Sequence, residues 1–78
     1  MVRTVRRHRL IRKNPEPFKI AIPLKKQGFS LYQARLWLSQ RKDLPGLYFE
    51  DDNSTVHHQF EFLFSDHVAA MAFKLHWA

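Results

Sequence analysis

Cysteine is absent from the 78-residue chain, and glycine occurs only twice, at Gly28 and Gly46. Without cysteine the chain forms neither a disulfide nor a thiolate zinc site, and a reducing compartment is expected. Two isolated glycines cannot build a phosphate-cradling loop. No apolar run approaches the roughly 20 residues of a membrane span, and the charged N-terminus lacks the apolar core of a secretory signal. The sequence therefore predicts a cytoplasmic protein that does not engage a membrane.

What the chain does contain is typical of a globular domain: 45% hydrophobic, 26% charged and 14% aromatic residues. A chain this short buries only about 60–65% of its unfolded surface, so large side chains must fill its core. The aromatic residues supply that area. We expect a single domain over residues 18–78, preceded by a basic arm or edge strand over residues 1–17. The segment Pro15-Glu16-Pro17 interrupts regular structure between them.

Charge is divided unevenly along the chain, whose formal net charge is +6. Residues 1–26 hold nine Lys and Arg against one Glu, whereas residues 50–78 hold five acidic residues against one Lys. A chain of this kind can direct its basic end toward a polyanion. Equally, the basic end can be solvated or can pair with the acidic end of the same molecule, and the sequence leaves both alternatives open.

Alternating apolar residues predict three strands. Phe18, Ile20 and Ile22 share one face, and Pro23 either ends this strand or places it at an edge. A short strand follows over residues 47–50, after a Pro45-Gly46 turn of type II. A polar hairpin connection over residues 51–54 leads into the clearest strand, residues 56–64. Its first face holds five residues, Val56, His58, Phe60, Phe62 and Phe64.

Two helices are expected. The first runs from about residue 31 to residue 41, with Ser30 as its cap and Gln33 completing a capping box. Tyr32 and Leu36 lie off its apolar stripe, where they either pack under a loop or form a protein-binding patch. The second helix spans residues 67–77 after a cap at Ser65 or Asp66, and it is apolar around most of its circumference.

This order of elements predicts an α+β fold. A three- or four-stranded, mostly antiparallel sheet would carry both helices on one face, in the order β-α-β-β-α, after the basic arm or edge strand.

The sequence shows no constellation for catalysis. Ser30 and Ser65 stand where helix caps belong, and no nucleophile elbow is present. His57 and His58 are adjacent in a predicted strand, so they face opposite sides and cannot chelate one ion together. The acidic residues 50–52 suit a hairpin loop better than a pair of catalytic carboxylates. We therefore expect no enzyme, no metal and no cofactor.

The basic N-terminal segment carries the strongest functional signal. Arginine engages phosphates bidentately, and such contacts position a protein without reading base sequence. Six cations fall within eleven residues, and two lysines beyond the first strand extend the predicted set of polyanion-binding residues: Arg3, Arg6, Arg7, Arg9, Arg12, Lys13, Lys25 and Lys26. The predicted partner is nucleic acid or a nucleoprotein complex.

The C-terminal segment has a distinctive sequence of residues: Phe60, Phe62, Phe64, Asp66, Ala69, Ala72, Phe73, Leu75 and Trp77. They make up a strand of alternating aromatic residues, an acidic cap, an alanine-rich helix and a final Phe-x-Leu-x-Trp. This pattern resembles the ending of small uncharacterised proteins of tailed bacteriophages. The resemblance covers about the last twenty residues closely and residues 18–50 loosely, and it implies no catalytic residue. It implies a setting in the cytoplasm of an infected bacterium.

Two hypotheses follow for an accessory protein of this kind. In the first, the basic segment docks on nucleic acid or a nucleoprotein complex. In the alternative, the chain is a protein-interaction module that modulates a host enzyme or defence complex through Tyr32, Leu36 and part of the last helix, or it is a minor component of the virion.

Overall fold

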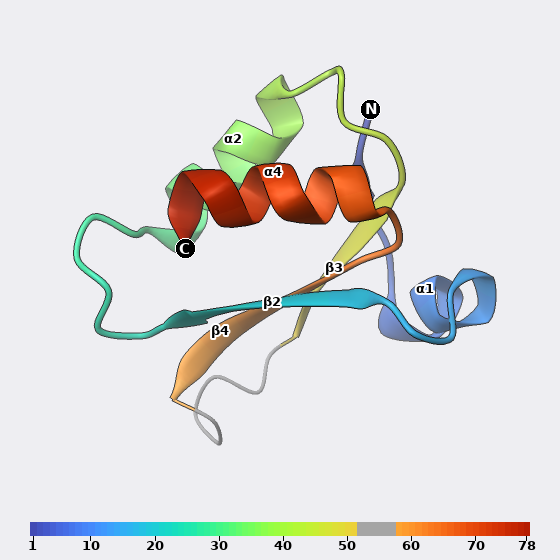
Figure 1. The fold of residues 1–78 in the computed structure, drawn as a ribbon, viewed down its shortest axis with the longest axis horizontal. Helices are drawn as coiled ribbons and strands as arrows, with labels where there is room; N and C mark the ends of the chain where they lie inside the picture. Colours follow the sequence, from blue (N-terminus) through green and yellow to red (C-terminus); the bar gives the residue numbers. More distant parts are fainter. Residues whose placement is uncertain (52–57) are drawn as a thin grey trace.

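The computed structural model describes residues 1–51 and 58–78. Their strands form one mixed sheet in the order β1-β3-β4-β2, and two helices cover one of its faces (Figure 1). The fold is α+β, as the sequence predicts. The elements are β1 (Arg3–Thr4), α1 (Arg7–Lys13), β2 (Phe18–Pro23), α2 (Leu31–Gln40), β3 (Leu47–Asp51), β4 (Gln59–Phe64) and α4 (His67–Trp77).

The sheet is antiparallel except at one edge. β4 pairs antiparallel with both β2 and β3, with Phe62 opposite Ile20 and Glu50. β1 pairs parallel with β3, which makes the N-terminal segment a short edge strand. β2 forms the other edge, where Pro23 is tolerated because an edge strand does not need every backbone N–H.

The core lies between the sheet and the layer of α2 and α4. Phe62, Phe64 and Phe73 are fully buried, and the Phe73 ring centroid lies 4.6 Å from that of Phe62 and 5.3 Å from that of Phe64. Ala34 and Leu38 supply the buried stripe of α2, as its periodicity predicts. The three largest fully buried side chains are therefore aromatic, and they supply a large share of the volume that so short a chain needs.

Side-chain caps begin both helices of this layer. The backbone N–H of Gln33 donates to Ser30 Oγ at 3.5 Å, and that of Val68 donates to Asp66 Oδ1 at 2.8 Å. Ser65, the alternative cap for α4, instead accepts from the backbone N–H of Leu47 at 2.8 Å. The two predicted helix starts are confirmed, with Asp66 as the cap of the second.

The expectation for the N-terminal segment was incomplete, because it also contains helix α1. Val2, Val5, Leu10 and Ile11 follow neither a strand nor a helix period, so the sequence pattern predicts only an arm or an edge strand. β1 confirms the edge strand. α1 lies beside the end of the sheet where β2 begins, apart from the α2 and α4 layer (Figure 1), and it contacts β3.

The last predicted strand begins later than its alternation indicates. β4 starts at Gln59, and His58 has a φ of 56°, in the left-handed region. A residue in that conformation cannot continue the pleat, so exposed His58 does not join the buried face of Phe62 and Phe64. Residues 52–57, which include most of the predicted hairpin connection and the first part of the predicted strand, lie outside the described residues.

Candidate polyanion-binding surface

Helix α1 carries most of the N-terminal cations, although its own sequence favours a helix only weakly. It has seven residues, no acidic residue in its first turn and no side-chain hydrogen bond at its N-cap, Arg6. Isolated helices this short do not form in water. Like charges at helical spacing, such as those of Arg9 and Lys13, oppose it by a further ~0.2–0.5 kcal/mol per pair. Tertiary contacts must therefore hold α1.

Two contacts fix α1 to the rest of the protein. Leu10 is its one buried side chain and is fully inaccessible to solvent. At the end of the helix, the side-chain amide of Asn14 donates to the carbonyl oxygen of Ser65 at 2.9 Å. The backbone N–H of Asn14 donates to the carbonyl oxygen of Leu10. An apolar anchor and a polar anchor thus set the position of the basic helix.

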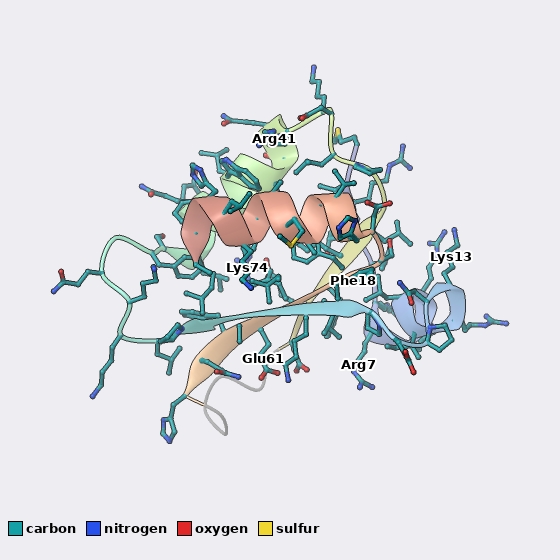
Figure 2. The ribbon with its side chains drawn as sticks, viewed as in Figure 1. Arg7, Lys13, Phe18, Arg41, Glu61 and Lys74 are labelled. Atoms are coloured by element: carbon teal, nitrogen blue, oxygen red, sulfur yellow. The ribbon has the colours of Figure 1, made fainter. Side chains whose placement is uncertain are left out.

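The N-terminal cations, defined as the six basic side chains of residues 3–13, are all exposed. They are Arg3, Arg6, Arg7, Arg9, Arg12 and Lys13. Figure 2 shows Arg7 and Lys13 pointing outward from different sides of α1. Within residues 1–51 and 58–78, no ion pair or side-chain hydrogen bond involves any of the six.

The acidic residues that do form ion pairs use other cations. Glu61 lies 3.1 Å from Lys19 Nζ, and Glu50 receives a bidentate hydrogen bond from Arg35. Hydrogen bonds with Glu50 raise the pKa of Arg35. Among the described residues, the acidic C-terminal half therefore leaves the N-terminal cations unneutralised.

A further ion pair lies after α2. Arg41 Nη2 contacts Asp43 Oδ2 at 2.8 Å, and hydrogen bonding from Arg41 lowers the pKa of Asp43 to about 2. The Arg41 guanidinium also lies 4.9 Å from the centroid of the Trp37 ring. This cation is therefore engaged within its own loop.

Lys25 and Lys26 are not part of the same patch. α1 lies beside the start of β2, whereas the two lysines follow its end (Figure 1). The six residues of that strand separate the two groups by roughly 20 Å, since an extended residue spans about 3.3 Å. Lys26 Nζ donates to the carbonyl oxygen of Ala78 at 3.3 Å. The structure thus brings the N-terminal cations together at one end of the sheet and leaves the two lysines at the other.

An open hollow of about 500 Å³ lies among β1, the end of α1 and the start of β3. Two of the N-terminal cations, Arg3 and Lys13, line it, and none of its lining residues within the described part of the chain is acidic. We call it the β1–α1 hollow; its lining residues are Met1, Arg3, Lys13, Asn14, Gly46, Leu47 and Ser65. This hollow is not predictable from the sequence, because its lining comes from four separate segments of the chain.

A second hollow, of about 370 Å³, has the opposite character. Glu50, Asp51 and Glu61 line it together with Arg35 and apolar side chains. Arg35 is already bound to Glu50. The acidic lining would repel an anion, so this hollow does not extend the cationic surface.

Apolar side chains are exposed on both helices of the layer. The predicted protein-binding residues Tyr32 and Leu36 of α2 are 71% and 44% exposed. A second group on α4, the α4 strip, consists of Val68, Met71 and Leu75, of which Leu75 is 82% exposed. The sequence predicts that this helix is apolar around most of its circumference, but it does not show that the α4 strip faces solvent.

The described residues hold no group of three or more His, Asp or Glu side chains that could bind a metal ion. No helix within them is long and apolar enough to cross a membrane. The fold and the surface together define a small α+β protein in which the six N-terminal cations lie at one end of the sheet and form no ion pair with a carboxylate of the described residues. No family model, curated protein or solved structure matches this chain.

Proposed function

We propose that this protein is a small accessory protein that docks on nucleic acid, free or within a nucleoprotein complex, through the N-terminal cations. The observation that carries the proposal is that all six are exposed and that none is neutralised by a carboxylate of residues 1–51 or 58–78. The bacteriophage resemblance of the C-terminal segment makes an infected bacterial cytoplasm the setting of the proposal.

The structure of the basic segment supports docking over simple solubility. Five of the six N-terminal cations are arginines, whose planar donor groups match phosphate oxygens. Concentrating like charges on one short helix works against folding, yet the anchors at Leu10 and Asn14 hold that helix in place. A fixed cationic surface loses less conformational entropy on binding than a free arm does.

The length of α1 limits the number of contacts. Seven helical residues span about 10 Å, which corresponds to about three base-pair steps of a duplex. Such a surface reaches the phosphates but offers few side chains to base edges. We therefore expect binding to depend strongly on salt and weakly on base sequence.

The test compares two double variants that remove equal charge from opposite ends of β2. Arg9→Gln/Arg12→Gln removes two N-terminal cations, and Lys25→Gln/Lys26→Gln is the matched control. With a fluorescent 20-base-pair DNA duplex and the corresponding RNA, the first variant should lose affinity on the order of 30-fold at 0.15 M salt. This factor follows if each lost phosphate contact changes by about 0.9 the slope of the logarithm of the binding constant against the logarithm of salt concentration. The control should change affinity only slightly. Equal losses in both variants would show that net charge, and not this surface, drives binding.

The exposed apolar residues favour one alternative function, a module that binds a host or viral protein. Tyr32 and Leu36 on α2 and the α4 strip present large side chains to solvent. Isolated exposed apolar residues are ordinary, but Val68, Met71 and Leu75 follow helical spacing and share one face.

A pull-down from nuclease-treated bacterial lysate separates the two functions. The alternative predicts a stoichiometric protein partner that survives nuclease and is lost with Met71→Glu/Leu75→Glu. Docking on nucleic acid predicts that retained material disappears after nuclease and that the α4 variant behaves like the original chain. Detection of the protein in purified virus particles by mass spectrometry would identify a virion component.

A further inference from the structure

The floor of the β1–α1 hollow is held rigidly by hydrogen bonds centred on Ser65. Its Oγ accepts from the backbone N–H of Leu47 at 2.8 Å, its backbone N–H donates to the carbonyl of Leu47 at 2.9 Å, and its carbonyl accepts from Asn14. Three segments of the chain, the ends of α1 and β4 and the start of β3, are thereby joined at one residue. The floor is preorganised, as a binding site requires.

Gly46 allows these segments to approach closely. Its φ is +90°, and a Cβ at this position would lie 2.7 Å from Ser65 Oγ and 2.9 Å from Asp66 Cβ. The carbonyl of Gly46 accepts from the backbone N–H of Arg3 at 3.1 Å, which fixes the other wall of the hollow. These contacts fix the position of the backbone on both sides of the hollow, at Ser65 and at Arg3.

The donors that border this hollow are free to bind an anion. Arg3 and Lys13 are exposed and have no carboxylate partner in the described part of the chain. The Ser65 hydroxyl accepts one hydrogen bond and retains its own O–H as a donor. Two features oppose an anion. The carbonyl groups at the end of α1 carry only a partial charge, smaller than the two full positive charges. The carboxylate of Asp66, next to Ser65, is engaged by the backbone N–H of Val68.

We propose that the β1–α1 hollow binds one phosphate group, held by the side chains of Arg3 and Lys13 and by the Ser65 hydroxyl. The inference rests on the proposed function and deepens it. The exposed cations of α1 would make diffuse contacts along the polyanion, whereas the hollow would hold one phosphate in a fixed position. That phosphate would set the orientation of the protein on its partner.

The test uses the full chain labelled with ¹⁵N and titrated with inorganic phosphate against chloride at constant ionic strength. Binding in the hollow should shift the amide signals of Gly46, Leu47 and Ser65 with a common saturation curve. Arg3→Gln/Lys13→Gln should abolish these shifts. Arg9→Gln/Arg12→Gln, which removes the same charge from α1, should leave them in place. The spectrum itself reports whether each variant is folded, and Lys13→Gln alone provides a milder change at an exposed side chain.

Two results overturn the inference. One is the absence of phosphate-dependent shifts at the three floor amides of the original chain. The other is an equal loss of those shifts in both double variants, which indicates general charge screening. Neither result affects salt-dependent duplex binding, which tests the proposed function separately. Conversely, phosphate binding in the hollow without any duplex binding would refute the proposed function and leave the anion site standing.

Discussion

Replacing Leu10 with alanine should detach the basic helix from the sheet. Leu10 is fully buried and is the only buried side chain of α1. Removing a fully buried leucine side chain typically costs about 2–5 kcal/mol, through lost burial and the cavity left behind. Because α1 lies at the end of the sheet and its neighbours can relax into the space, we expect the lower part of that range, about 2–3 kcal/mol.

The stability lost in the Leu10→Ala variant should affect α1 before the rest of the protein. A seven-residue helix has no stability of its own, so α1 should unfold while the sheet and the layer of α2 and α4 remain. The free energy of unfolding of a domain this size is only about 4–12 kcal/mol, so the global effect should also be measurable in urea.

Amide hydrogen exchange measures both effects. The N–H of Asn14, which donates to the carbonyl of Leu10, should exchange at least about 30-fold faster, since each 1.4 kcal/mol corresponds to tenfold. Leu75→Ala removes the same atoms from a side chain that is 82% exposed and should change stability by less than about 0.5 kcal/mol. Unchanged exchange in α1 after Leu10→Ala would refute the conclusion that Leu10 holds the cationic surface in place.

Three further predictions concern the turns and caps. Gly46→Ala should destabilise the protein by about 2–3 kcal/mol, whereas Gly28→Ala, with a φ of +79° but open space around it, should cost about 1 kcal/mol; urea unfolding compares them. Asp43 should titrate at about 2 by NMR, and Arg41→Gln should raise its pKa toward the ordinary value of 3.8 without fully restoring it, because a backbone hydrogen bond at Asp43 also lowers the pKa. Because the pKa of Asp43 is lowered, this pair stabilises the fold above pH 3.8 and is lost as the pH falls through about 2. Asp66→Ala should cost about 1 kcal/mol by loss of the α4 cap, measured in urea.

Local sequence signals predicted the α+β layer well. The alternation of Ile20 and Ile22, the cap at Ser30 and the positive φ expected of Gly46 each follow from residues close together in the sequence, and all three are present. The left-handed backbone at His58 was not predictable, because histidine has only a modest preference for that conformation and nothing nearby requires it.

Contacts between distant segments of the chain determine the features of the candidate surface that the sequence does not predict. α1 forms because Leu10 is buried where the helix contacts β3 and because Asn14 donates to the carbonyl of Ser65, and no local pattern reveals such long-range contacts. The separation of Lys25 and Lys26 from the N-terminal cations was already implied by the predicted strand over residues 18–22, since its extended length keeps the two groups apart. The β1–α1 hollow could not be predicted, because it depends on how four segments meet.

The salt dependence of DNA binding by the unaltered chain measures directly whether the N-terminal cations contact phosphates. If four to six of the N-terminal cations each meet a phosphate of a 20-base-pair duplex, the logarithm of the binding constant should fall with the logarithm of salt concentration with a slope of roughly −3.6 to −5.4. Affinity should then drop roughly 10²- to 10³-fold between 50 and 200 mM salt. A slope near zero, or no binding at 50 mM salt, would contradict the account.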